Sequence, residues 1–297
     1  MSAPWHEVRE KGGETAIRLT VWLATAFGRG PARAVLAVVA LYYAAFHGAT
    51  RRASREYLRR VGAPAGFGDV YQHVLRFVHV ALDRFFLLRG KGGHFVVESH
   101  GTELLRDAQA AGRGGILLGA HLGSFDALRM TAQRRNYRVN IAGYSRNARM
   151  INNALRALNP EAQARVVEID PEHVDFILAL REMVERGEFV AILGDRALPG
   201  ARTVTVDFLG GRAKLPVGPY VLAAVLKCPV FLTFGLYREP NRYDLHCELL
   251  AERVVLPRAD RNAGAAEYAA KYAARLEHYC REVPDNWFNF YDFWEPP

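Results

Sequence analysis

The residues with the clearest chemical potential are His121 and Asp126, which follow an apolar, glycine-rich run. Residues 114–126 read GGILLGAHLGSFD. A histidine can take a proton near neutral pH, and a carboxylate on its other ring nitrogen fixes the tautomer and stabilises the imidazolium that forms. The pair is therefore predicted to act as a general base with its orienting acid.

The spacing of this pair restricts the local structure. On one continuous helix, a five-residue offset places two side chains roughly 140° apart, so they would diverge. They converge only across a strand-to-helix turn, for which Gly119 and Gly123 supply backbone freedom. A helix that begins just after His121 would also disfavour its protonation and keep it available as a base.

Strand-like and helix-like segments alternate after residue 93, which indicates a mixed, largely parallel α/β sheet flanked by helices. Strands are predicted at residues 94–99, 115–118, 138–144, 165–169, 189–194, 230–237 and 243–249. Helices are predicted at residues 103–110, 125–134, 148–158, 173–186 and 216–226. Sites in such sheets gather beyond the carboxyl ends of the strands, where His121, Arg146 and Asp195 are all expected.

The first 90 residues form a different region, predicted to be helical. Apolar helices are expected at residues 15–27, 34–46 and 72–88. The run 34–46 is shorter than the roughly 20 residues that a spanning helix needs, so a buried or interfacial helix is favoured. Two interpretations stay open, ordinary core helices or docking to a membrane surface. The predicted division is residues 1–90, a membrane-associating helical region, and residues 91–297, a single α/β domain.

Charge and cysteine content narrow the class of partner. Lysine and arginine number 39 against 31 acidic residues, a formal net charge of +8. The excess is clustered at Arg51, Arg52, Arg55, Arg59 and Arg60 and at Arg129, Arg134, Arg135, Arg138, Arg146, Arg149, Arg156 and Arg165. Such patches attract phosphates, anionic membranes or acidic proteins. No nucleic-acid-binding motif accompanies them, and the three scattered cysteines suggest neither a disulfide framework nor a zinc site.

The histidine block resembles the His-x-x-x-x-Asp/Glu signature of the lysophospholipid acyltransferase superfamily. Residues 119–126 look most like the bacterial lipid A late acyltransferases within it. Three further blocks are similar to this family: residues 142–149 around Arg146, residues 191–196 ending in Asp195 and Arg196, and the loop-like residues 210–219. The resemblance implies a glycerolipid acyltransferase-like fold, with Arg146, Asp195 and Arg196 binding substrate.

The C-terminus departs from the lipid A pattern. Residues 284–294 keep tryptophan but lack the basic residues with which those enzymes tend to finish, and they look more like a predicted acyltransferase branch of the family. Lipid A as the acceptor is therefore in doubt. The aromatic residues of this ending are expected to pack in the core, with a lipid-facing role as the alternative.

The resemblance implies an acyltransferase that needs no metal and no cofactor. His121, oriented by Asp126, would activate a hydroxyl or amine of a lipid-like acceptor to attack the thioester of an acyl carrier protein or of coenzyme A. The expected location is the cytoplasmic face of the bacterial inner membrane, peripheral or monotopic, on an anionic surface. The alternative is a catalytically inactive membrane-binding or carrier-binding module of the same fold.

Overall fold

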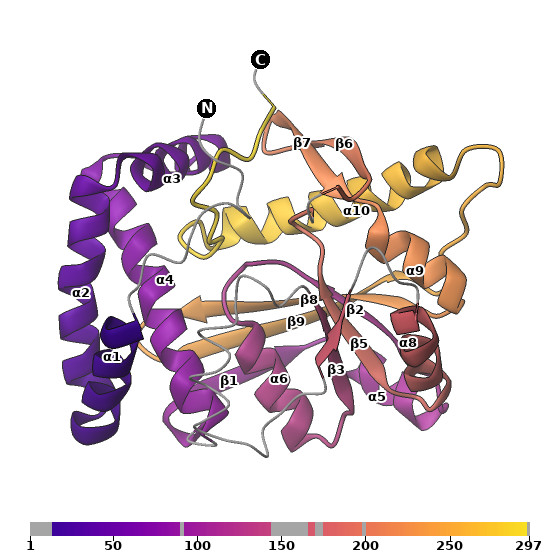
Figure 1. Cartoon of the computed structure of the whole chain (residues 1–297), viewed down its shortest axis with the longest axis horizontal. Helices are drawn as coiled ribbons and strands as arrows, with labels where there is room; N and C mark the ends of the chain where they lie inside the picture. Colours follow the sequence, from indigo (N-terminus) through magenta and orange to yellow (C-terminus); the bar gives the residue numbers. More distant parts are fainter. Residues whose placement is uncertain (1–13, 90–91, 144–165, 170–174, 198–199, 296–297) are drawn as a thin grey trace. The chain divides into compact units, whose positions relative to one another are not determined.

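A computed structural model describes residues 14–89, 92–143, 166–169, 175–197 and 200–295 (Figure 1). The chain forms two compact units. Among the described residues, the first contains 14–89, 92–94 and 279–293, and the second contains 95–143, 166–169, 175–197, 200–278 and 294–295. The C-terminal segment that belongs to the first unit was expected to be part of the α/β region.

The first unit is built on α1 (Glu14–Phe27), α2 (Arg29–Phe46), α3 (Gly48–Val61), α4 (Phe67–Leu88) and the short η1 (Gly92–His94). α3 ends because Gly62 takes a left-handed conformation with φ +85°, which a glycine adopts without strain. No single helix among the described residues is long and apolar enough to cross a membrane. α2 and α3 meet that test only as a pair, with a 90° bend between them.

The aromatic C-terminal segment packs inside the first unit. Trp287 is fully buried, and its ring meets the ring of Tyr57 edge-on at 5.1 Å. Nε2 of His73 donates a hydrogen bond of 2.9 Å to the Trp287 carbonyl oxygen. Arg76 of α4 binds the Asp285 carboxylate at 2.8 Å. These contacts show the packing role that was expected for this segment.

The second unit contains a seven-stranded sheet in the described part of the chain, in the order β1-β9-β8-β2-β5-β3-β4. The strands are β1 (Val96–His100), β2 (Gly115–Gly119), β3 (Val139–Gly143), β4 (Val166–Glu168), β5 (Phe189–Leu193), β8 (Val230–Arg238) and β9 (Arg242–Ala251). All neighbouring pairs are parallel except β8 and β9, which are antiparallel. The predicted mixed, largely parallel α/β sheet is confirmed.

Helices flank this sheet, which explains why its central strands are apolar throughout. They are α5 (Glu103–Ala110), α6 (Phe125–Arg134), α8 (Asp175–Glu185), α9 (Gly218–Leu226) and α10 (Arg261–Glu282). Leu117 of β2 packs in a cluster with Leu105 of α5, and its neighbour Leu118 lies on the side of Tyr272 of α10. Successive side chains of a strand point to opposite faces, so β2 is covered on both.

Several elements differ from the sequence prediction, among them α3, which was not predicted as a helix of its own. Residues 203–216 form an antiparallel hairpin, β6 (Thr203–Phe208) and β7 (Gly211–Pro216), so most of the block expected to be a loop is a strand. Trp294 closes this hairpin by donating from Nε1 to the Phe208 carbonyl oxygen at 2.9 Å. The long helix α10 was not predicted. The helix expected at residues 148–158 lies outside the described residues.

Candidate active site

The register between β2 and β5 brings the two halves of the candidate site together. Gly119, the last residue of β2, pairs with Leu193, the last residue of β5. The Gly194 amide continues the pairing by donating to the Gly119 carbonyl oxygen at 2.9 Å. His121 and Asp195 each stand two residues beyond these partners. Two parallel strands therefore deliver a histidine and a carboxylate to the same sheet edge.

Asp195 holds His121 through two hydrogen bonds. Its Oδ1 lies 2.8 Å from Nδ1 of the imidazole, and its Oδ2 accepts from the His121 backbone amide at 3.0 Å. The carboxylate on Nδ1 is thus Asp195 rather than Asp126, the residue that the sequence predicted for this role. Asp126 instead lies in the first turn of α6. The substrate-binding role expected for Asp195 is also corrected, because its side chain is only 1% exposed and faces His121.

A tight turn separates His121 from α6. Gly123 has φ +61°, and a Cβ atom there would collide with the carbonyl oxygen of Gly235 in β8. The Ser124 amide donates to that same carbonyl oxygen at 2.7 Å, and the Ser124 hydroxyl accepts from the Ala127 amide at 3.1 Å. Ser124 is therefore the cap of α6, and glycine at 123 lets the turn pass close to β8.

The electrostatics keep His121 neutral and Asp195 ionised. Burial lowers the pKa of His121 below its usual value, and the nearby Arg196 charge lowers it further, while Asp195 acts in the opposite direction. Burial raises the pKa of Asp195, but the facing His121 and the charge of Arg196 outweigh it and hold that pKa well below its usual range. A neutral imidazole whose Nδ1 carries the proton toward a carboxylate leaves Nε2 as the basic nitrogen.

Nε2 of His121 is the atom open to chemistry. One third of the His121 side chain is exposed, and within the described ranges Nε2 makes no hydrogen bond. The arrangement can therefore accept a proton from a bound hydroxyl or amine and later return it.

Tyr272 of α10 is a supporting residue that the sequence analysis missed. Its hydroxyl donates to the Gly119 carbonyl oxygen at 2.9 Å, and its ring lies beside Gly194, where an added Cβ would approach it to 3.4 Å. Tyr272 thus braces the ends of both strands that carry the dyad. The available signal was the apolar period of α10, whose buried positions include Ala265, Ala269, Tyr272 and Leu276.

Of the other two residues expected to bind substrate, the structure describes one. Arg196 follows Asp195 directly and lies within electrostatic reach of the dyad. Arg146, expected to bind substrate, lies outside the described residues.

Burial raises the pKa of Cys228 to about 11 and of Cys247 to about 12, which keeps both thiols protonated at neutral pH. In the described part of the chain, no three His, Cys, Asp or Glu side chains are grouped to hold a metal ion.

Comparison with known proteins supplies the family. The sequence model of the bacterial lipid A biosynthesis acyltransferase family matches residues 94–295 of this chain. The chain belongs to this acyltransferase family. No curated protein matches the chain.

Membership in the lipid A biosynthesis acyltransferase family gives the chemistry in general terms, which is transfer of an acyl group from a donor to a lipid. The matched residues include His121, Asp126, Asp195 and Arg196. The match begins at His94, so it includes none of α1 to α4. The family match therefore covers the sheet-containing unit together with the C-terminal segment of the first unit.

Proposed function

We propose that this acyltransferase moves a fatty acyl group from a thioester donor to a hydroxyl or amine of a lipid-like acceptor, with His121 as general base. The observation that carries the proposal is the hydrogen bonding of the two nitrogens of the His121 imidazole. Its Nδ1 is held by a buried carboxylate, while Nε2 is open and the side chain is partly exposed. This is the geometry that a neutral histidine needs to remove a proton.

In the proposed reaction, Nε2 of His121 takes the proton of the acceptor as its oxygen or nitrogen attacks the thioester carbonyl carbon. The tetrahedral intermediate then collapses, the carbon–sulfur bond breaks, and the imidazolium returns the proton to the departing thiolate. Asp195 stabilises the imidazolium between these steps. Arg196 supplies positive charge near the dyad, which suits an anionic part of the substrate or the developing oxyanion. Asp126 is assigned to the support of α6 at its N-terminal turn.

Acyl transfer by the purified full-length protein tests this mechanism. His121→Ala is expected to lower turnover by about 10² to 10⁴-fold, because it removes the base from the rate-determining step. Mass spectrometry of lipids from cells with and without the protein would identify the acceptor and the acyl chain. Near wild-type transfer by folded His121→Ala protein would end the proposal. Lipids that do not change, together with no transfer in vitro, would favour the inactive binding module.

The donor proposed is an acidic acyl carrier protein in preference to free coenzyme A. Arg134 and Arg135 are exposed at the C-terminal end of α6, and Arg138 is 76% exposed just beyond it. An acidic helix could engage several of these cations at once, and attraction of this kind accelerates encounter at low ionic strength.

Charge reversal separates the two donors. Arg134→Glu with Arg135→Glu is expected to slow transfer from the carrier-bound donor severalfold and to leave a short acyl-coenzyme A substrate unaffected. Arg253→Glu with Arg258→Glu is the matched control, because both residues are exposed in the loop before α10 and the net charge changes equally. An equal loss with both donors, or with the control, would contradict a carrier-docking role.

The proposed location is the cytoplasmic face of the inner membrane, with peripheral or monotopic attachment. α2 supports this location because large apolar side chains lie on its exposed face and small ones on its buried face. Its buried residues are the small Ala32, Ala40 and Ala44, whereas the large Val38, Tyr42 and Phe46 are 68%, 59% and 76% exposed. Trp22 and Phe27 of α1 are also more than half exposed. Exposed apolar surface of this kind is typical of a membrane or protein contact.

Cell fractionation tests this location. The full-length protein is expected in the membrane fraction, and high salt should release only part of it, because apolar burial persists when charge is screened. Recovery entirely in the soluble fraction at low salt would contradict membrane attachment.

A further inference from the structure

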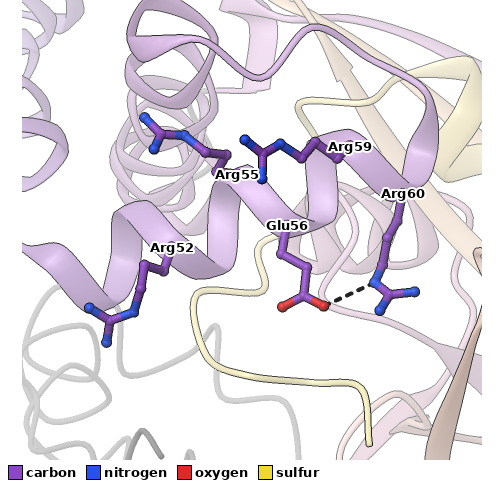
Figure 2. Close-up of a pocket in the computed structure, with 5 residues that line it drawn as sticks. All are labelled: Arg52, Arg55, Glu56, Arg59 and Arg60. Atoms are coloured by element: carbon purple, nitrogen blue, oxygen red, sulfur yellow. Dashed lines mark hydrogen bonds and ion pairs between the residues drawn. The ribbon is translucent and has the colours of Figure 1, made fainter. Parts of the chain in front are cut away.

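A basic pocket lies along α3 in the first unit. Its lining residues are Arg52, Arg55, Glu56, Arg59 and Arg60, and its volume is about 520 Å³. Figure 2 shows the five side chains on one stretch of α3. The pocket is remote in sequence from the proposed dyad, and the acyl-transfer mechanism does not use it.

The pocket carries more positive charge than its own residues neutralise. Glu56 is the one acid in the lining, and it already binds Arg60 through a 3.0 Å ion pair, drawn as a dashed line in Figure 2. Within the described part of the chain, the side chains of Arg52, Arg55 and Arg59 make no hydrogen bond and no ion pair. Residues at these three- and four-residue offsets project from one side of a helix. Three guanidinium groups thus share one surface without an anion.

The arginine side chains of the pocket indicate which kind of anion it would bind. Its planar fork donates two parallel hydrogen bonds to a phosphate or carboxylate, whereas lysine acts as a point charge. All four cations of the pocket are arginine. Phosphate oxygens of a bound headgroup could be shared among neighbouring guanidinium groups in this geometry.

The neighbouring surface distinguishes a lipid from an acidic protein. α2 ends at Phe46 and α3 begins at Gly48, with a 90° bend between the helices. Arg51 secures this corner by donating to the carbonyl oxygens of Ala44 and Ala45, and His47 caps α3 by accepting from the Thr50 amide. The exposed apolar residues of α2 therefore precede the arginines of α3 along the chain, on the other side of this corner. An apolar surface joined to phosphate-binding cations is complementary to a membrane interface.

We propose that the α3 pocket binds the phosphate of an anionic phospholipid headgroup while the exposed residues of α2 contact the acyl region. The proposal rests on the membrane attachment given above and is independent of the acyl-transfer reaction. It assigns to the N-terminal helices a specific lipid site in addition to general attraction for a negative surface.

Sedimentation of the full-length protein with vesicles tests the site. The vesicles are phosphatidylcholine alone, phosphatidylcholine with phosphatidylglycerol, and phosphatidylcholine with enough oleate to match that surface charge without an added phosphate. The test variant combines Arg52→Gln, Arg55→Gln and Arg59→Gln. The control combines Arg253→Gln, Arg258→Gln and Arg261→Gln, three exposed arginines around the start of α10, and makes the same change in net charge. A third variant replaces the three pocket arginines with lysine.

Each arginine at an anionic surface strengthens binding about fivefold, so the triple Gln variant is expected to bind phosphatidylglycerol vesicles about a hundredfold more weakly. Its binding to phosphatidylcholine alone should match wild type, and the control variant should stay within about twofold, as expected for charges outside the contact. The lysine variant should bind phosphatidylglycerol several times more weakly than wild type, and wild type should prefer phosphatidylglycerol to oleate.

Any of four results would overturn the site. Wild-type affinity in the lysine variant, or equal affinity for oleate vesicles, would show diffuse attraction without phosphate recognition. An equal loss in the control would show dependence on net charge alone. Loss of binding to an acidic carrier protein in the triple Gln variant, with vesicle binding intact, would assign the pocket to that partner. His121→Ala should bind vesicles like wild type, which separates this test from that of the proposed reaction.

Discussion

Two histidines of this protein, His73 and His121, differ in what their second ring nitrogen meets. His73 of α4 is fully buried, with the Ser54 hydroxyl on Nδ1 at 2.8 Å and the Trp287 carbonyl oxygen on Nε2 at 2.9 Å. His121 has a carboxylate on Nδ1, and its side chain is one third exposed. His73 has both nitrogens satisfied and holds a chain terminus, whereas His121 has one nitrogen available for a proton.

The partner of Nδ1 determines whether each imidazole can carry a positive charge. Ser54 is neutral, and burial lowers the pKa of His73 to about 4, so this imidazole stays uncharged throughout the physiological range. Asp195 is ionised and raises the pKa of His121 against the effects of burial and of Arg196. A histidine that must carry a proton briefly during a reaction needs such a counter-charge, and a histidine that only links two segments does not.

Among changes to the partners of the two histidines, Asp195→Asn is expected to have the largest effect, because it makes the partner of His121 as neutral as that of His73. Turnover is expected to fall by about 10² to 10³-fold, since the imidazolium loses its counter-charge and the amide favours the wrong tautomer. The acid limb of the kcat/KM profile should lie below pH 6.5 in the wild type, because the pKa of His121 is lowered. In the variant it should move to still lower pH. A merely structural loss would leave the limb in place.

His73→Ala tests the structural role assigned to His73. The variant leaves a cavity and removes the partner of the buried Ser54 hydroxyl, while the Trp287 carbonyl oxygen keeps its hydrogen bond from the Asn289 amide, so stability is expected to fall by about 2–4 kcal/mol. His121→Ala, at a partly exposed position, should change stability by about 1 kcal/mol or less. Urea unfolding and single-turnover kinetics on both variants give the two readouts. Loss of turnover in folded His73→Ala protein would contradict the division of roles.

The pH dependence of stability should reflect His73. Its pKa is about 4 in the folded protein and near 6.5 unfolded. The unfolded state therefore binds the proton first, and stability is complete above pH 6.5 and declines as the pH falls toward 4. Asp195 has a lowered pKa, so its contribution is lost only below its unfolded value, near pH 4. Urea midpoints of His73→Gln measured across this range should fall less steeply with acid than those of the wild type.

Asp126→Asn is expected to have the smallest effect, about tenfold or less on turnover, because the carboxylate on Nδ1 is Asp195. The acid limb of kcat/KM should not move. A loss as large as that of Asp195→Asn, together with a displaced limb, would restore Asp126 as the orienting acid that the sequence spacing predicted.

Local pattern was enough to predict much of the sheet-containing unit. The continuous apolar runs of β2 and β5 and the boundaries of α5 and α6 agree with the structure, because these segments are buried as their composition implies. α10 was missed because its buried stripe mixes glycine and alanine with larger side chains, which gives a weak hydrophobic period. The hairpin of β6 and β7 was missed although charged residues such as Asp207, Arg212 and Lys214 alternate with its buried positions, a period that indicates a half-buried strand.

The candidate site was predictable in position but not in pairing. Strand ends rich in ionisable residues indicated that His121 and Asp195 belong to one sheet edge. The partner of Nδ1 depends on which strands are neighbours and in what register, and no short-range spacing contains that information. A spacing of five residues made Asp126 the local choice, and a strand pair separated by 74 positions along the chain supplied the actual carboxylate.

The register of β2 against β5 has a consequence for any attempt to transplant or dissect this centre. A single-residue insertion in either strand would turn its following side chain to the opposite face of the sheet and separate the base from its acid. The glycine-rich histidine segment copied alone onto another scaffold would carry no dyad. Catalytic competence must therefore appear late in folding, once this long-range strand pairing has formed, and a split protein would regain activity only when its fragments restore that pairing.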